Sequence, residues 1–429
     1  MSARLPHQPS HGLDRSFPVA SSEPDSRSVV SHSKAVDPFS TQSTEHVSPF
    51  AKSAPLAFLL NHIPDVLPTA ATAVVYCEGN FGAIDGKTAN GLVRHSEKYQ
   101  ILSVIDSEQS GLDTGVVLGY PANSIPLVSD LDHAIELAGR VPDYFIFGIA
   151  PASGMLSAVE RGIVLEAMSR GMHVVSGLHE FLGEDAEFLA AQAEHSVTIH
   201  DVRRPRDKKD LRTFCGAIKS VTCPRIVVLG TDCAIGKRTT ATILTKSLND
   251  RGIKAVLVGT GQTGLIQGAK YGVALDAIPS QFCAGEMEAA VVEAFLGEHP
   301  DVIIVEGQGA LSHPAYLTSG FILKGSQPQA VILQHAPARK RMADFPDVPM
   351  PKPKREINLI QTFSDTKVIG LTINHENMSD ADISAAILLY ELQLGIPATD
   401  ALARPTDRLV DMVLGAFPEL EPKLAAVAS

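Results

Sequence analysis

The residues best suited to chemistry lie in a glycine-bounded loop that follows an apolar, β-branched run at 226–229. A helical pattern begins directly after the Gly236-Lys237 pair. A strand, a glycine-rich loop and a helix in this order direct backbone N–H groups and the positive helix end at an anion, and a lysine neutralises terminal phosphate oxygens. The spacing therefore predicts a phosphate-binding loop. Its residues are Gly230, Thr231, Asp232, Cys233, Ala234, Ile235, Gly236, Lys237, Arg238, Thr239 and Thr240.

This loop departs from the standard phosphate-binding pattern. Gly230 and Gly236 enclose five residues rather than four, and Arg238 stands where a Ser or Thr normally offers its hydroxyl to Mg²⁺. Thr239 or Thr240 would have to supply that hydroxyl. Glu306 ends a second apolar run, at the edge of an α/β sheet where ligands bind, and its carboxylate is a hard oxygen ligand for Mg²⁺, directly or through water. The alternative is a turn glutamate that only caps the following segment.

Cys233 lies inside the same loop, where N–H groups and Lys237 would favour a reactive thiolate. The alternative is a small side chain that leaves room for phosphate, and we expect this second role. The five cysteines of the chain show no Cys-x-x-Cys spacing. We therefore expect no disulfide framework or structural zinc, as in a reducing compartment such as the cytoplasm.

Three further groups of polar residues stand at predicted strand ends. The run 259–264 contains Gln262, His335 is followed by Arg339 in a basic, proline-rich segment, and His375 lies in an Asn-His-Glu-Asn run. We expect the segment after His335 to form a loop or lid, and it is either a solvated loop or one whose cations bind an anionic substrate. Either histidine would accept a proton at neutral pH, although a lone histidine in a loop is more often structural or exposed.

The first half of the chain carries its own cationic stretch at 85–95. Lys87 and Arg94 are seven positions apart and share one helical face, beside Thr88. Two cations on one face would hold a dicarboxylate or a phosphate. From spacing alone, a solvated basic face explains them equally well.

Apolar runs alternate with helical patterns on both sides of a charged segment at 201–222. This alternation predicts two α/β units with parallel sheets: a Rossmann-like domain at 51–210 and a P-loop domain at 211–429. The Ser- and Pro-rich residues 1–50 predict a disordered extension, since their acidic residues do not suit a targeting peptide. Predicted strands span 72–77, 100–105, 144–149, 172–176, 254–259, 301–306, 328–333 and 366–372. Predicted helices span 130–140, 155–169, 236–250, 282–297, 379–391 and 406–417.

Composition limits the classes of function. The chain has 429 residues, 45% of them hydrophobic and 20% charged, as is ordinary for a globular protein with sizeable cores. Its longest apolar runs are far shorter than the ~20 residues that span a bilayer. A net charge of −12 argues against a nucleic-acid partner, which needs a basic face. We therefore expect a small-molecule partner, no membrane partner, and a homo-oligomer, the common state of soluble enzymes.

The loop Gly-Thr-Asp-Cys-Ala-Ile-Gly-Lys and the Val-Glu-Gly strand end resemble those of dethiobiotin synthetase and its relatives. This resemblance implies that Lys237 contacts phosphates, that Asp232 and Glu306 hold Mg²⁺, and that Thr239 supplies the hydroxyl. Over residues 55–420 the chain is also similar to the bipartite family that includes D-glutamate N-acetyltransferases. Besides the loop, this similarity rests on three motifs: Asp-Gly-Lys-Thr-Ala-Asn-Gly-Leu-Val-Arg (85–94), Gly-Thr-Gly-Gln-Thr-Gly (259–264) and Val-Glu-Gly-Gln-Gly (305–309). That family pairs a Rossmann-like domain with a P-loop domain.

The second resemblance implies acetyl transfer from acetyl-CoA to the amine of an acidic amino acid such as D-glutamate. It also favours a ligand role for Lys87, Thr88 and Arg94, while Gln262 and Arg339 are predicted to bind substrate from their place at strand ends. The P-loop would then hold the diphosphate of coenzyme A, with His335 or His375 as the base and backbone N–H groups as oxyanion donors.

Two other functions remain open. In a ligase or kinase that uses ATP and Mg²⁺, the loop would activate a carboxylate as an acyl phosphate before amine attack, and Lys237 would act in catalysis. A nucleotide-gated accessory protein is the third possibility. The absence of His-rich or Cys-rich tracts argues against metal handling by such a protein.

Overall fold

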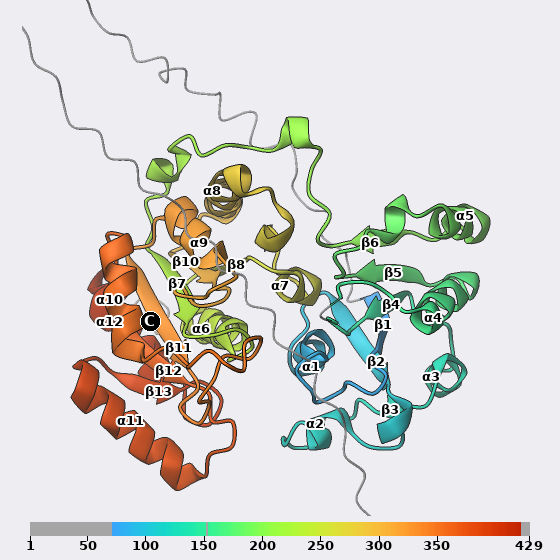
Figure 1. Ribbon diagram of the computed structural model, residues 1–429, viewed down its shortest axis with the longest axis horizontal. Helices are drawn as coiled ribbons and strands as arrows, with labels where there is room; N and C mark the ends of the chain where they lie inside the picture. The colour runs from blue at the N-terminus through green and yellow to red at the C-terminus, as the bar shows by residue number, and fades with distance from the viewer. Residues whose placement is uncertain (1–70, 152, 422–429) are drawn as a thin grey trace, which may run out of the picture. The chain divides into compact units, whose positions relative to one another are not determined.

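The structure is a computed structural model that describes residues 71–151 and 153–421. The predicted extension at 1–50 lies outside the described residues. Two all-parallel sheets, flanked by helices, dominate the fold (Figure 1). The predicted α/β class, with a Rossmann-like unit followed by a P-loop unit, is confirmed.

The first sheet has the strand order β3-β2-β1-β4-β5-β6. Its order reverses between β1 and β4, and sheets of this kind bind ligands at the carboxyl ends of the strands where the order reverses. The strands are β1 (Ala71–Tyr76), β2 (Tyr99–Ile105), β3 (Leu127–Val128), β4 (Tyr144–Phe147), β5 (His173–Ser176) and β6 (Ile199–Asp201). The helices are α1 (Lys87–Arg94), α2 (Thr114–Val117), α3 (Leu131–Ala138), α4 (Ala158–Ser169) and α5 (Ala186–His195).

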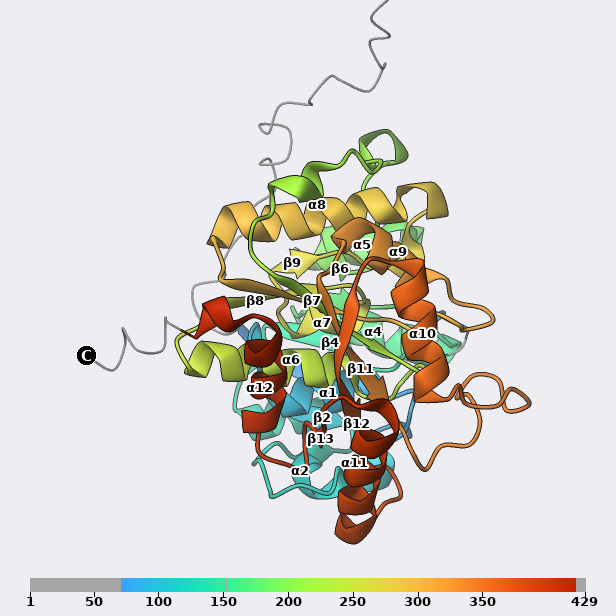
Figure 2. The same ribbon diagram turned by 90° about the vertical axis from the view of Figure 1, so that its left-hand side faces the viewer.

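The second sheet has the order β13-β12-β11-β7-β10-β8-β9. The strands are β7 (Arg225–Gly230), β8 (Ala255–Gly259), β9 (Tyr271–Gly272), β10 (Val302–Glu306), β11 (Ala330–His335), β12 (Lys367–Ile373) and β13 (Ala398–Asp400). The helices are α6 (Lys237–Asp250), α7 (Gln262–Gln267), α8 (Ser280–Glu298), α9 (Thr318–Ser326), α10 (Pro353–Phe363), α11 (Asp380–Leu394) and α12 (Asp407–Ala416). Figure 2 shows α8 and α9 on one side of this sheet and α6 and α12 on the other.

Strand β7 lies at the centre of the second sheet, between β11 and β10. Every residue of β7 is buried, because its side chains alternate between two apolar layers. Val227 and Leu229 join the layer under α8 and α9, whereas Ile226 and Val228 pack with Leu244 of α6. This anchoring fixes the point at which β7 delivers the glycine-rich loop.

Local signals in the sequence explain where several helices begin and end. Ser157 and Glu160 form a capping box at the start of α4, and Ser379 does the same with Asp382 at the start of α11. All the longer predicted strands and helices occur within a few residues of their expected positions. The prediction did not include the short strands β3, β6, β9 and β13, nor the helices α5, α9 and α10.

Hydrogen bonds join α1 of the first half to α7 of the second. The Gln267 side-chain amide donates to the carbonyl oxygens of Gly91, at 2.5 Å, and His95, at 2.6 Å. The hydroxyls of Thr88 and Thr263 are 3.1 Å apart. The helix that begins at Lys87 is therefore tied to the segment after β8.

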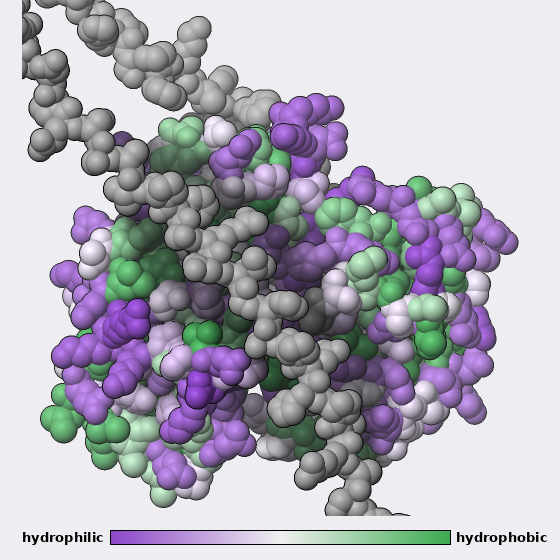
Figure 3. Space-filling view, viewed as in Figure 1, coloured by the Kyte–Doolittle hydropathy of each residue, from purple (hydrophilic) through white to green (hydrophobic). Residues whose placement is uncertain are grey.

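On the face of the molecule shown in Figure 3, hydrophilic and hydrophobic residues are mixed. Helix α11 exposes leucines, with Leu388 68% and Leu392 85% accessible to solvent. None of the helices in the described residues combines the length and apolar character that crossing a membrane requires.

The expected homo-oligomer stays a prediction.

Candidate active site

The glycine-rich loop connects β7 directly to α6. Gly236 is the residue before the helix and has a φ of +94°, a conformation that strains any residue with a β-carbon. The Asn374 side chain, just past β12, donates to the carbonyl oxygen of Ile235 at 3.1 Å. The loop is thus held both by its own turn and by the end of a neighbouring strand.

Lys237 lies almost fully buried within the loop and donates a hydrogen bond from Nζ to the carbonyl oxygen of Asp232. Burial lowers the pKa of its ammonium group, and the charges of Asp232 and Glu306 oppose that shift. No carboxylate within the described residues forms an ion pair with Lys237. A phosphate oxygen would supply the missing negative partner.

Arg339 supports the loop from the segment after β11. Its guanidinium donates to Asp232 Oδ2 at 2.9 Å and to the carbonyl oxygens of Cys233 at 2.9 Å and Ala234 at 3.3 Å. It also pairs with both carboxylate oxygens of Glu376, each at 2.8 Å. Because its donors already have protein acceptors, Arg339 is placed to position the loop rather than to hold a substrate.

Cys233 carries a neutral thiol. Burial raises its pKa to about 11, although the charge of Lys237 opposes that rise. All five cysteines of the chain are free. These findings fit the expected role of a small side chain in the loop rather than a thiolate nucleophile.

His313, in the loop after β10, is a site residue that the sequence reasoning missed. Ligand atoms of Asp232, Cys233 and His313 all lie within 4.8 Å of one another, as in a metal site. However, the backbone N–H groups of Ala315 and Tyr316 both donate to His313 Nδ1, at 3.2 Å. A neutral His313 then carries its proton on Nε2, which faces Cys233 Sγ at 4.0 Å, so this nitrogen cannot bind a metal in that tautomer.

The residues predicted to hold Mg²⁺ do not fit that role well. Asp232 accepts hydrogen bonds at Oδ2 from Arg339 and from the Ala343 N–H, although its Oδ1 is buried without a partner. Thr240, the alternative hydroxyl, is buried and donates to Gln334 Oε1 at 2.7 Å. No contact between described residues joins Thr239, Asp232 and Glu306, and the metal site stays a prediction.

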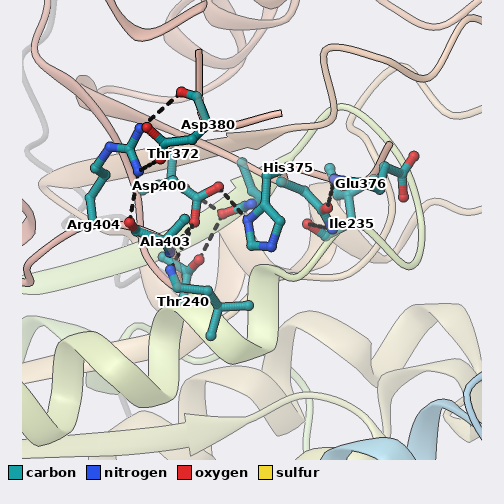
Figure 4. A network of polar contacts seen from close by, with 12 residues as sticks. Ile235, Thr240, Thr372, His375, Glu376, Asp380, Asp400, Ala403 and Arg404 are labelled. Atoms are coloured by element: carbon teal, nitrogen blue, oxygen red, sulfur yellow. Dashed lines mark hydrogen bonds and ion pairs between the residues drawn. The ribbon is translucent and has the colours of Figure 1, made fainter. Parts of the chain in front are cut away.

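A cavity opens beside the start of α6, and His375 lies in its wall. The lining includes Gly236, Thr239, Asn374, His375 and Asp400. His375 Nδ1 lies 2.8 Å from Asp400 Oδ2, at the end of β13 (Figure 4). Because a carboxylate accepts the Nδ1 proton, Nε2 of a neutral His375 is free to accept a proton from a ligand.

Asp400 is itself rigidly held. It is 1% exposed, and its Oδ1 accepts the backbone N–H groups of Leu402 at 2.9 Å and Ala403 at 2.8 Å. The His375 side chain, by contrast, is 34% exposed. A fixed carboxylate and an accessible imidazole form the arrangement that orients a general base.

His335 is not available for proton transfer. It is 5% exposed at the end of β11, where Nδ1 lies 2.8 Å from the Thr231 hydroxyl and the ring packs edge-on against Tyr390. Burial lowers its pKa to about 4. Of the two histidines predicted as bases, only His375 has the exposure that the role requires.

The buried His335 predicts a loss of stability in acid. The unfolded chain protonates this residue near pH 6.5, but the folded protein does so only near pH 4. The free energy of unfolding should therefore fall as pH drops from 7 to 4, with His335 contributing up to about 3 kcal/mol. Denaturant titrations of wild type and His335→Gln across this range would measure the contribution.

Other histidines with lowered pKa values, His179, His200 and His313, add to the same acid slope. The other three histidines titrate in both wild type and His335→Gln. The difference between the two proteins in how the free energy of unfolding depends on pH therefore gives the contribution of His335 alone. Parallel slopes in wild type and His335→Gln would show that His335 contributes nothing.

The structure places the residues predicted to bind substrate on α1, on α7 and after β11, and α1 and α7 are in contact. Lys87 is the first residue of α1, is exposed, and forms no ion pair with any described residue. Burial raises the pKa of Cys233, and the positive charge of Lys87 only weakly opposes this rise. Arg94 ends the same helix and covers the Tyr120 ring at 5.4 Å. Gln262 begins α7 and is buried.

Comparisons with known proteins agree with this architecture. Residues 107–205 match a family model described as a domain of unknown function (DUF1611_N), Rossmann-like domain, and residues 212–410 match its partner, described as a DUF1611_C P-loop domain. The solved structure of a DUF1611 family protein from Anabaena variabilis is 30% identical, with a TM-score of 0.74. The match covers 80% of this chain and 99% of that one.

Two curated relatives carry the name D-glutamate N-acetyltransferase. The protein from Tritonibacter scottomollicae is 32% identical over 62% of this chain and 79% of its own length. The protein from a Pseudoalteromonas species is 31% identical over 62% of this chain and 80% of its own length. The likeness to dethiobiotin synthetase stays a prediction from the loop sequence. The chain belongs to the DUF1611 family, which joins a Rossmann-like N-terminal domain to a C-terminal P-loop domain.

Proposed function

We propose that this protein transfers the acetyl group of acetyl-CoA to the amine of an acidic amino acid such as D-glutamate. The similarity to two D-glutamate N-acetyltransferases, over most of their length, carries the proposal. The site geometry supports it, because the same half of the chain contains a phosphate-binding loop and an accessible histidine paired with a carboxylate.

Coenzyme A would bind through its diphosphate, which resembles that of ADP. The loop before α6 offers backbone N–H groups and the buried ammonium of Lys237 to this diphosphate. Lys87, which is exposed and forms no ion pair with the residues that the structure describes, supplies a cation for a carboxylate of the amino acid.

His375 is the proposed base. The neutral amine attacks the thioester carbonyl, a C–N bond forms and the C–S bond breaks. The proton lost by the nitrogen passes to His375 Nε2, while the departing thiolate of coenzyme A takes a proton from solvent. Asp400 stabilises the imidazolium that results, because its Oδ2 lies at Nδ1.

Mass spectrometry of product formation tests this function. The purified protein is incubated with pooled acidic amino acids, either with acetyl-CoA alone or with ATP, Mg²⁺ and a pool of carboxylates. We expect an N-acetylated amino acid and free coenzyme A from the first mixture. Separate incubations with the D and L forms then identify the stereochemistry.

The second mixture tests the ligase alternative. An amide product that forms only with ATP and appears together with ADP would establish ATP-dependent ligation and contradict acetyl transfer. In that outcome, the loop would bind a nucleotide that is consumed rather than the diphosphate of coenzyme A.

A further inference from the structure

The guanidinium of Arg238, at the end of the phosphate-binding loop, has no hydrogen-bond or ion-pair partner among the described residues. Arg238 is the second residue of α6, directly after Lys237. Its Nε is buried without a hydrogen-bond partner, and its side chain forms no hydrogen bond or ion pair with any residue at 71–151 or 153–421. A buried, charged donor without a partner is costly, and a bound anion would remove that cost.

Arg238 lies next to Glu306 at the end of β10. A β-carbon on Gly264 would clash with Glu306 Oε2 and lie 3.4 Å from Arg238 Nε, so both side chains lie close to this residue of α7. Any other residue at this position would force the Glu306 carboxylate to shift. The two groups also interact electrostatically. Burial raises the pKa of Glu306, and the positive charge of Arg238 partly opposes that rise.

Glu306 is therefore poorly placed to hold Mg²⁺. Its carboxylate accepts the Thr260 N–H at 3.0 Å and faces the positive charges of both Arg238 and Lys237. The additional positive charge of Arg238 would disfavour a divalent cation at this carboxylate. At the position where the standard loop has a hydroxyl for Mg²⁺, this chain has a positive charge of its own.

We propose that Arg238 replaces Mg²⁺ in this loop, so that the protein binds a nucleoside diphosphate group without a divalent cation. Lys237 and Arg238 together supply two positive charges, and Arg339 already neutralises Asp232. The planar guanidinium presents several donors to phosphate oxygens, as Mg²⁺ would present open coordination positions. The inference deepens the proposed function, because the diphosphate is that of coenzyme A.

Isothermal titration calorimetry of the full chain tests this inference. Coenzyme A and, separately, ADP are titrated in excess Mg²⁺ and in excess EDTA. We expect the Kd of each probe to agree within about twofold between the two buffers. Binding that is about tenfold or more weaker in EDTA, a difference of about 1.4 kcal/mol, would overturn the inference and leave the proposed function intact.

If neither probe bound in either buffer, the diphosphate site itself would be lost, and both proposals would be contradicted. Metal-dependent binding would overturn only the role of Arg238. The two failures are therefore distinguishable in one set of titrations.

Two variants separate the charge of Arg238 from its effect on folding. Arg238→Lys keeps the charge and should bind independently of metal. Arg238→Thr supplies the hydroxyl of the standard loop, and should bind about tenfold or more weakly in EDTA with partial recovery in Mg²⁺. Arg251→Thr, at the other end of α6, is the control for loss of one positive charge. Wild-type affinity of Arg238→Thr in EDTA would contradict the proposal.

Discussion

Lys237→Met is expected to weaken the binding of coenzyme A strongly while the protein remains folded. Methionine keeps the length of the side chain but removes the ammonium group that would meet the phosphate oxygens. The loss of charge-assisted hydrogen bonds, each about 1.5–3 kcal/mol, should weaken binding by about 100-fold or more. Calorimetric titration of coenzyme A into the variant measures this effect.

Folding should tolerate the change. Burial lowers the pKa of Lys237, which means that the folded protein bears a cost for keeping its charge away from water. Removing the charge removes that cost, against the loss of one hydrogen bond to the carbonyl oxygen of Asp232. A melting temperature within a few degrees of wild type would agree with this balance.

Lys246→Met provides the matched control. Lys246 lies on the same helix, α6, but is exposed and pairs with Asp250 at 2.6 Å. This variant should bind coenzyme A as wild type does. If Lys237→Met also kept wild-type affinity, the glycine-rich loop would not be the phosphate site.

The phosphate-binding loop could be predicted because its signals are local. An apolar β-branched run makes β7, Gly236 permits the left-handed turn, and Lys237 begins the helix. These features depend on neighbouring residues in the chain, so spacing alone identifies them. The alternation of strands and helices likewise predicts the two α/β units.

The support around the loop could not be predicted in the same way. Arg339 lies more than a hundred residues after Asp232, and only the parallel pairing of β11 with β7 brings it to the loop. Its basic, proline-rich surroundings suggested a lid that binds an anion. The contacts with Asp232 and Glu376 show instead that protein acceptors occupy its guanidinium.

The two histidines predicted as bases differ for reasons that the sequence does not contain. Both lie at the ends of adjacent strands, His335 on β11 and His375 after β12. Tyr390, on a distant helix, covers His335. His375 remains partly exposed, and Asp400 reaches it because the short strand β13 pairs with β12. The prediction did not include β13, and it therefore missed the carboxylate.

Replacement of His375 by alanine is expected to lower kcat for acetyl transfer by about 100-fold or more, because a positioned general base contributes roughly 10²–10⁴-fold. The affinity for coenzyme A should stay within a few-fold of wild type. Steady-state kinetics with the amino acid and acetyl-CoA each varied at saturating levels of the other, together with calorimetric binding of coenzyme A, measures both quantities. His133→Ala, an exposed histidine on α3, is the control and should leave both unchanged.

Asp400→Asn tests the orientation of the ring rather than its presence. The variant keeps an oxygen for the N–H groups of Leu402 and Ala403, but its side-chain NH₂ would face His375 Nδ1 and donate to it. The ring proton then moves to Nε2, which can no longer accept a proton from the amine, so kcat should fall while KM changes little.

If His375→Ala instead raised KM for acetyl-CoA and left kcat unchanged, the cavity beside α6 would bind the cofactor, and the base would have to be another residue.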